Sequence, residues 1–377
     1  MRHSRFKKVA WHSLAIILVV VLVGLCILGS TTLACRSLRQ VSIQLQWTTQ
    51  AQFAGYYVAL DKGWYREEGI DLTIKPGGPD LAPVDLVASG KSQFGTSFLA
   101  DLCVAIQKGK EVISIGQIQQ KNGLLLIAKK SSGIEEPKDL VGKRVGVWLG
   151  SWEAQFDVLM ANEGVSLKDV KVTSQGGSIE PFLKGDLDVA SAMIYNEYQS
   201  VLESGLKAED LNVIDYSTYG LGFPGDVLFT SRKMAEKHPD LCVHMLSASL
   251  RGWQYAIDNP EEAADIVLKY DQSGVLTRQH QISMINEISK LIQMPGRDIG
   301  YTDRTSVKQT IYILRQGVLG GTLQPEDVYT NDFWNQVHEK HGEKTPTSES
   351  FGNITSFNLS PLIKESAMHG CTGHHEV

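Results

Sequence analysis

Short β-type runs and helical runs alternate along this chain, stop at a polar stretch and then start again. The first series opens with VSIQLQW at 41–47, continues through a helix over about 52–68 and reaches IDLTIKP at 70–76. Gly69 stands where a glycine ends a helix. Such alternation is typical of a largely parallel sheet with helices on its faces, and 377 residues are enough for two such units.

The later elements keep the same rhythm. The first series continues with a helix over 84–89, a strand over 92–98, a helix over 101–108 and strands over 112–118 and 124–130. The polar run SSGIEEPKD (131–139) interrupts, and the second series follows with strands over 143–148, 170–174, 189–195 and 211–217 and helices over 152–162, 180–184 and 196–204. A glycine-rich stretch (218–226) leads into a strand over 227–231, and from Pro239 the pattern is mostly helical, including 241–257 and 260–270.

The amino-terminal segment has the layout of an export signal. Basic side chains precede an unbroken apolar run over 14–29, and the tetrad TLAC that ends at Cys35 resembles a bacterial lipobox with its usual Leu one place out. We expect residues 1–34 to be a signal peptide, Cys35 to be lipidated and 35–40 to link it to the fold. Cleavage after Ala34 without lipidation, or retention of the helix, are the alternatives. All three place the rest of the chain outside the cytoplasmic membrane.

Charge and cysteine content exclude several partners. The formal net charge of −6 becomes −10 without the signal peptide, so nucleic acid and anionic lipid surfaces are not expected partners. The cysteines beyond Cys35 are too scattered for a disulfide framework or a zinc site: Cys103, Cys242 and Cys371. A group at the C-terminus could bind a metal, although a frayed tail is the favoured interpretation: His369, Cys371, His374 and His375. We therefore expect neither metal nor cofactor.

Several motifs between residues 41 and 268 resemble one known family. They are a strand ending in QW at 46–47, AQFAGYYVALDKGWYREEGIDLTI at 51–74, PGG at 76–78, ASGKSQFG at 88–95 and EEPKDLVGKRVGV at 135–147. In this order they are similar to the extracytoplasmic substrate-binding proteins of ABC importers, in the branch that takes up alkanesulfonates, thiamine pyrimidine precursors and riboflavin.

The resemblance implies an α/β, two-lobed type II periplasmic-binding-protein fold with two hinge crossings and a helical C-terminal part. The ligand would be clamped between the lobes, and the lobes would close around it. We expect crossings at 129–139 and 217–227, lobe 1 over 41–128 and 227–345, lobe 2 over 129–226 and an irregular tail over 346–377. A membrane permease is the implied partner of a monomeric protein.

The loops that follow the strands should line the cleft, because ligands of open α/β sheets bind beyond the carboxyl ends of the strands. Six loops qualify: 47–53, 77–83, 97–101, 149–155, 195–199 and 219–226. None contains Lys or Arg, whereas together they carry Asp80, Asp101, Glu153, Glu197 and Asp226. A sulfonate or phosphate site would normally include a guanidinium. Five of the loops carry aromatic residues, which predicts a flat, neutral or weakly cationic heteroaromatic ligand.

We expect the following residues to contact that ligand: Trp47, Gln50, Gln52, Phe53, Gly77, Gly78, Ser97, Phe98, Ser151, Trp152, Tyr195, Asn196, Glu197 and Asp226. Trp47 could instead pack inside its lobe, and Asn196 and Glu197 could serve only the start of a helix. Tyr57, Leu60 and Trp64 share the stripe of a buried helix face and are expected in the core. A thiamine pyrimidine precursor and a riboflavin-like compound are the leading ligands.

An enzyme is the alternative. A eukaryotic branch similar to this family makes the thiamine pyrimidine from pyridoxal phosphate and one of its own histidines, with a lysine to hold the cofactor aldehyde. Aligned on the SGK…G pattern, this chain has Ser97 and Asp101 where that lysine and histidine would stand. The branch's iron-binding cysteines are also missing from GLGFPGD at 220–226. The sequence therefore favours a binding protein over a pyrimidine synthase.

Overall fold

The computed structural model describes residues 38–79, 81–149, 153–316 and 319–341, and the part from Gln40 onward forms one compact unit. The predicted signal peptide, the lipidation site Cys35, the tail over 346–377 and two expected ligand contacts, Ser151 and Trp152, lie outside the described residues. Within the described ranges, no helix is long and apolar enough to cross a membrane.

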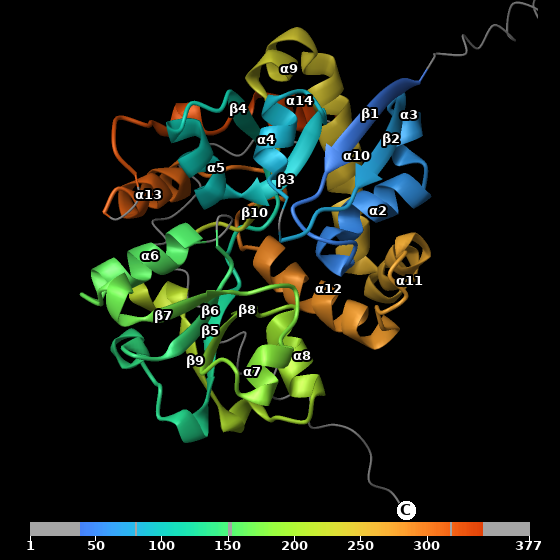
Figure 1. Cartoon of the computed structure of the whole chain (residues 1–377). Coiled ribbons are helices and arrows are strands. Elements are labelled where there is room, and N and C mark those ends of the chain that lie inside the picture. The colour runs from blue at the N-terminus through green and yellow to red at the C-terminus, as the bar shows by residue number, and fades with distance from the viewer. Residues whose placement is uncertain (1–37, 80, 150–152, 317–318, 342–377) are drawn as a thin grey trace, which may run out of the picture. The chain divides into compact units, whose positions relative to one another are not determined.

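The first of two five-stranded sheets has the strand order β2-β1-β3-β10-β4 (Figure 1). Its strands are β1 (Arg39–Gln44), β2 (Ile70–Lys75), β3 (Phe94–Phe98), β4 (Val112–Gln117) and β10 (Asp226–Ser231). β1 and β3 are parallel, with Ile43 opposite Phe94, whereas β10 is antiparallel to both β3 and β4. Every residue of β4 (VISIGQ) is buried, including its Ser114 and Gln117.

The second sheet has the order β7-β6-β8-β5-β9. Its strands are β5 (Leu124–Lys129), β6 (Arg144–Val147), β7 (Lys171–Ser174), β8 (Val189–Met193) and β9 (Leu211–Asp215). β6 is parallel to β7 and β8, whereas β5 is antiparallel to β8 and β9. The expectation of largely parallel sheets is thus wrong for β5 and β10. Both strands arrive from the other sheet, without the helical crossover that keeps neighbouring strands parallel.

The chain passes between the sheets at residues 118–123, from β4 to β5, and at 216–225, from β9 to β10. The first passage was expected at 129–139, so the strand over 124–129 lies in the second sheet and not the first. Its apolar run LLLIA is buried between two partners there, β8 and β9. Residues 130–140 form two short 3-10 turns instead, η2 (Lys130–Ser132) and η3 (Pro137–Leu140). The lobe boundaries themselves stay a prediction.

The helix expected over about 52–68 consists of three pieces: η1 (Ala51–Phe53), α2 (Ala54–Asp61) and α3 (Trp64–Glu67). Gly63 separates α2 from α3, because its φ of 77° lies in the left-handed region. Gly69 follows α3 with a φ of 78°, which confirms the predicted helix-ending glycine. Tyr57 and Trp64 are buried and Leu60 packs against the core, so the predicted apolar stripe is also confirmed.

The remaining expected helices are present. α4 (Pro83–Ala88) and α5 (Leu99–Gln107) follow β2 and β3. α6 (Glu153–Asn162), α7 (Glu180–Lys184) and α8 (Glu197–Glu203) alternate with the strands of the second sheet. Short 3-10 turns fill three connections: η4 (Leu167–Asp169), η5 (Ala208–Asp210) and η6 (Tyr216–Tyr219).

The helical C-terminal part is confirmed. Its elements are α9 (Arg232–Lys237), α10 (Pro239–Asp258), α11 (Pro260–Tyr270), α12 (Arg278–Ile292), α13 (Arg304–Leu314), η7 (Pro325–Asp327) and α14 (Asp332–His341). α10 crosses α2 at a pair of glycines, where a Cβ on Gly252 would lie 2.0 Å from the carbonyl oxygen of Gly55. Only glycine permits this approach. α12 lies beside both α8 and α11 (Figure 1).

Candidate functional site

A groove of about 480 Å³ opens beside the carboxyl ends of β1 and β3 and faces the start of α6. It is called the α5–α6 groove here, and its lining includes Gln46, Trp47, Ser97, Asp101, Glu153 and Asp157. These residues come from three of the loops expected to line a cleft and from positions next to them. The groove therefore lies where the carboxyl-end rule places ligands in an α/β sheet.

Asp226 lies directly behind the groove, at the first position of β10 and opposite Phe98 on β3. Its two carboxylate oxygens accept hydrogen bonds from Gln46 Nε2 at 2.9 Å and from Gln52 Nε2 at 3.0 Å. Gln50 extends the network by donating to Gln52 Oε1 at 2.9 Å. Burial raises the pKa of Asp226 to about 7, although the two glutamine donors oppose that shift.

Other polar atoms gather around this carboxylate. Four residues each present at least one buried side-chain atom without a hydrogen-bond partner among the described residues: Gln46, Tyr56, Gln119 and Tyr195. Gln119 belongs to the site through its backbone N–H, which donates to Asp226 O at 3.1 Å. Burial, followed by the charge of Asp226, raises the pKa of the Tyr195 hydroxyl well above its usual range. A buried polar atom without a partner costs about 1–3 kcal/mol, so these atoms are suited to hold a polar ligand.

Gly225 explains how Gln119 fits beside Asp226. A Cβ at position 225 would lie 2.5 Å from Gln119 Oε1 and 2.9 Å from the carbonyl oxygen of Lys121. The glycine therefore lets the passage at 118–123 approach the passage at 216–225. The Asp226 cluster, meaning Asp226 with Gln46, Gln52, Tyr56, Gln119 and Tyr195, lies where both passages meet the sheets.

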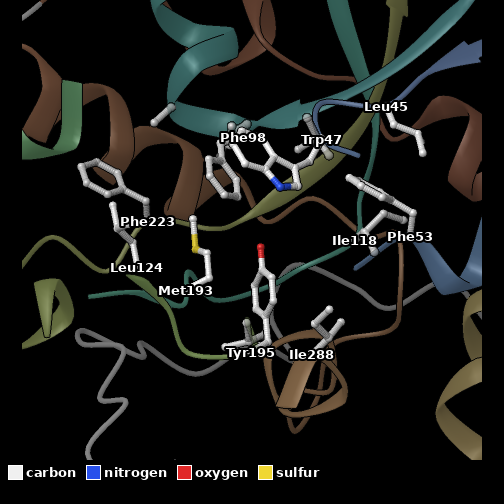
Figure 2. Packing of buried hydrophobic residues seen from close by; sticks show 14 of the residues in the cluster. Leu45, Trp47, Phe53, Phe98, Ile118, Leu124, Met193, Tyr195, Phe223 and Ile288 are labelled. Atoms are coloured by element: carbon white, nitrogen blue, oxygen red, sulfur yellow. The ribbon is translucent and has the colours of Figure 1, made fainter. Parts of the chain in front are cut away.

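Aromatic rings from both sheets border the cluster. Trp47 makes an edge-to-face contact with Trp148, with ring centroids 6.3 Å apart, and a Cβ on Gly177 would lie 3.4 Å from the indole. Trp47 therefore reaches across to loops of the second sheet. In Figure 2 the Tyr195 hydroxyl points toward Trp47 and Phe98, and Met193 rises beside it. Such rings favour a flat ligand, because aromatic faces and edges pack well against them.

The α5–α6 groove is rich in carboxylates. Burial, and then the nearby charge of Asp226, raises the pKa of Asp101 well above its usual range. Burial and the neighbouring Glu153 raise the pKa of Asp157 to about 6. Lys108 and Lys110 also line the groove, beyond the loops considered from sequence, and Lys110 pairs with Asp85 at 2.6 Å. Lys108 is seven residues from Asp101, roughly 10 Å along the helix, so the end near Asp226 is the acidic one.

Ten of the fourteen predicted ligand contacts are found at these places or next to them. Trp47 and Ser97 line the groove, and Gln52 and Asp226 form the hydrogen-bonded centre, with Gln50 behind it. Phe53, Phe98 and Tyr195 are buried around that centre. The remaining two, Gly77 and Gly78, lie in the turn after β2.

Gly77 has a structural reason of its own to be glycine. Its N–H donates to Trp47 O at 2.8 Å, and a Cβ there would lie 2.2 Å from the carbonyl oxygen of Leu45. Gly77 thus supports the Trp47 loop from behind, whereas the Cβ position of Gly78 faces open space.

Asn196 and Glu197 serve the start of α8. Glu197 Oε2 accepts from Met193 N at 2.9 Å, and Asn196 Nδ2 donates to Glu197 Oε1 at 2.7 Å. Asn196 Oδ1 faces His280 Nε2 on α12 at 3.0 Å. Burial raises the pKa of Glu197 to about 7. Their local partners support the helix-start interpretation, although Asn196 directly follows Tyr195.

No group of three or more His, Cys, Asp or Glu residues in the described part of the chain is arranged to hold a metal ion. The described thiols, Cys103 and Cys242, are buried and not linked by a disulfide.

The model of one protein family, described as NMT1/THI5 like, matches residues 50–263, which is more than half of the chain. The chain belongs to the NMT1/THI5-like family.

Relatives of this NMT1/THI5-like protein include both binding proteins and synthases. It is 27% identical over 310 residues to the riboflavin-binding protein RibY of Chloroflexus aurantiacus, covering 79% of this chain and 86% of that one. It is 23% identical to the formylaminopyrimidine-binding protein of Halalkalibacterium halodurans, covering 73% and 84%. It is also 28% identical to a 4-amino-5-hydroxymethyl-2-methylpyrimidine phosphate synthase of Legionella pneumophila, covering 60% and 72%.

The fold is that of periplasmic binding proteins. The alkanesulfonate-binding protein SsuA of Xanthomonas axonopodis pv. citri superposes with a TM-score of 0.58 at 15% identity, covering 77% of this chain and 98% of that one. The two-lobed α/β architecture expected from sequence is thereby confirmed.

Several residues of the site in this NMT1/THI5-like protein were not predicted as ligand contacts: Gln46, Tyr56, Asp101, Gln119, Trp148 and Asp157. Trp148 directly follows β6. It lies one residue before the loop at 149–155, which was expected to line the cleft. Trp47 has a similar place in the loop after β1. Gln119 lies in the passage at 118–123, which was expected at 129–139. An accurate prediction of where β6 and β4 end would have pointed to Trp148 and Gln119.

Proposed function

We propose that this protein is the solute-binding component of an ABC importer and captures a small heteroaromatic compound at the Asp226 cluster. The observation that carries the proposal is the Asp226 carboxylate, held by Gln46 and Gln52 and surrounded by unpaired polar atoms and aromatic rings from both sheets. An aromatic heterocycle offers N–H donors for Asp226, acceptors for the Gln119 amide and a face for Trp47.

The groove favours neutral or weakly cationic ligands. Asp101, Glu153 and Asp157 line the groove, so a sulfonate or phosphate there would lie among carboxyl groups. A thiamine pyrimidine precursor and a riboflavin-like compound fit this chemistry, and two relatives are named for ligands of these kinds. Ser151 and Trp152, in the loop before α6, stay candidate contacts.

The transport role requires delivery outside the cytoplasmic membrane. We propose export by the amino-terminal signal, anchoring through lipidated Cys35 and transfer of the ligand to a membrane permease by a monomer. The passages at 118–123 and 216–225 are the proposed hinges, because within the described residues the backbone joins the two sheets at these two places.

Calorimetric titration of the full chain in mild detergent tests the proposal. The panel is riboflavin, formylaminopyrimidine, hydroxymethylpyrimidine and taurine. We expect one heteroaromatic compound to bind with a Kd of about 1 μM or tighter and taurine not to bind. Asp226→Asn should weaken that binding at least about tenfold, because it removes a charge-assisted hydrogen bond. Asp188→Asn is the matched control, since Asp188 pairs with Arg144 at the amino ends of β8 and β6. Binding of taurine alone would overturn the proposal.

A pyrimidine synthase is the second candidate, favoured by relatives that carry that name. Position 97 in β3 is Ser and position 101 in α5 is Asp, and neither can hold an aldehyde cofactor or donate an imidazole. Incubation of the full chain with pyridoxal phosphate and iron should yield no pyrimidine product. Any turnover would favour the synthase over the importer component.

A further inference from the structure

Two consecutive residues in the first turn of α12 hydrogen-bond to residues that adjoin Gln52 and Tyr195 of the Asp226 cluster. Gln281 is fully buried, and its Oε1 accepts a hydrogen bond of 2.7 Å from Ala51 N, at the start of η1. His280 Nε2 lies 3.0 Å from Asn196 Oδ1, and its Nδ1 lies 3.0 Å from both carboxylate oxygens of Glu203 on α8. One helical turn therefore joins the loop after β1 to α8 of the second sheet.

Both attachment points adjoin residues of the cluster. Ala51 precedes Gln52, which donates to Asp226, and Asn196 follows Tyr195, whose hydroxyl points toward Trp47 and Phe98 (Figure 2). The other end of α12 holds the first passage, because Leu291 O accepts from Gln120 N at 2.9 Å and from Lys121 N at 3.2 Å. α12 thus contacts both sides of the cluster and one of the two connections between the sheets.

We infer that His280 and Gln281 are positioning residues, and that together they form a clasp that holds Tyr195 over the Asp226 carboxylate. The inference rests on the proposed function, in which both sheets contact one ligand. Neither residue belongs to the Asp226 cluster itself. Gln281 orients the side that carries Gln52, and His280 orients the side that carries Tyr195.

Both ring nitrogens of His280 face hydrogen-bond acceptors. Asn196 Nδ2 donates to Glu197, so Asn196 presents its oxygen to His280, and the other ring nitrogen faces the Glu203 carboxylate. The imidazole ring thus bridges the two neighbours through two different atoms. A glutamine at position 280 can donate from one atom only, so His280→Gln breaks the bridge.

Other charged groups near this turn have partners of their own. Arg278 pairs with Asp265 and Glu261 of α11. Glu197 accepts hydrogen bonds from Asn196 and from the backbone of Met193.

Hydrogen–deuterium exchange of the ligand-free full chain tests the clasp. Peptides covering 49–53 and 195–203 report on its two sides. His280→Gln should lower the protection of the 195–203 peptide about tenfold relative to the wild type and leave the 49–53 peptide nearly unchanged. Gln281→Leu should lower the protection of the 49–53 peptide instead, because it removes the acceptor for Ala51 N.

His244→Gln is the matched control, since His244 lies on α10 and its Nε2 is 3.9 Å from Glu68. It should keep the wild-type protection of both peptides. Unchanged protection of the 195–203 peptide in His280→Gln would overturn the clasp.

Riboflavin and formylaminopyrimidine are the ligand probes for the second arm. His280→Gln should weaken the binding of whichever compound the wild type binds by about tenfold, whereas His244→Gln should bind it as the wild type does. If the wild type binds neither compound, the proposed ligand class fails, and the exchange experiment still decides the clasp.

Discussion

Gln52 donates a hydrogen bond of 3.0 Å to Asp226, although 174 residues separate them in the sequence. The bond joins the loop after β1 to the strand by which the chain returns from the second sheet. It places a buried carboxylate at the point where both sheets and both passages meet. The proposed ligand site depends on this placement.

The first prediction concerns the stability of the fold as a function of pH. Because burial raises the pKa of Asp226 to about 7, the folded protein keeps a proton between about pH 4 and pH 7 that the unfolded chain has released. The free energy of unfolding should therefore fall as the pH rises through this range, by up to about 1.4 kcal/mol per pH unit for this group. Asp226→Asn should make the fall shallower in urea unfolding at pH 5, 6 and 7. Glu197, with its own raised pKa, stays in the variant, so some slope should remain. An identical slope in the two proteins would contradict the burial of a titrating Asp226.

The second prediction separates two tryptophans. Trp47→Ala should weaken ligand binding by about tenfold or more, because it removes the ring that spans from the first sheet to Trp148. Trp64→Ala is the matched control, since Trp64 packs on Tyr255 and under Arg251, away from the groove. Calorimetric titration of both variants with the same compound gives the comparison. Equal losses in the two variants would mean that Trp47 acts only through stability.

The third prediction concerns the packing of α2 on α10. Gly252→Ala should lower the free energy of unfolding by about 2–4 kcal/mol, because the new Cβ would meet the Gly55 carbonyl at 2.0 Å. Gly78→Ala has open space around its Cβ and should change stability by less than about 0.5 kcal/mol. Urea unfolding of both variants measures the difference. Similar stability of the two would show that the helices can separate at little cost.

Much of the fold follows from local pattern. Gly69 was predicted because a helix-ending glycine depends only on its own backbone, and the order of strands and helices follows from periodicity. The break at Gly63 was missed because a glycine inside a helical pattern is usually tolerated. Membership of β5 in the second sheet depends on pairing with β8 and β9, and nothing in LLLIA distinguishes one sheet from the other.

The site could be predicted in part from the rule that ligands of α/β sheets bind beyond the ends of the strands. Trp47 follows β1, Ser97 lies near the end of β3 and Asp226 begins β10, and the rule placed them together. Asn196 was expected to face a ligand, but its partner His280 is 84 residues further along the chain, and such a pairing has no local signal. Gln119 was missed because its importance comes from the close approach of Gly225, which only the three-dimensional structure shows.

A crystal structure of the full chain with its bound compound tests the central claim most directly. The account predicts the heterocycle between Trp47 and Tyr195, with a ring or amino N–H within hydrogen-bonding distance of Asp226 and the Gln119 amide paired to the ring. A compound bound elsewhere, or one that leaves Asp226 in contact with Gln46 and Gln52 alone, would contradict it.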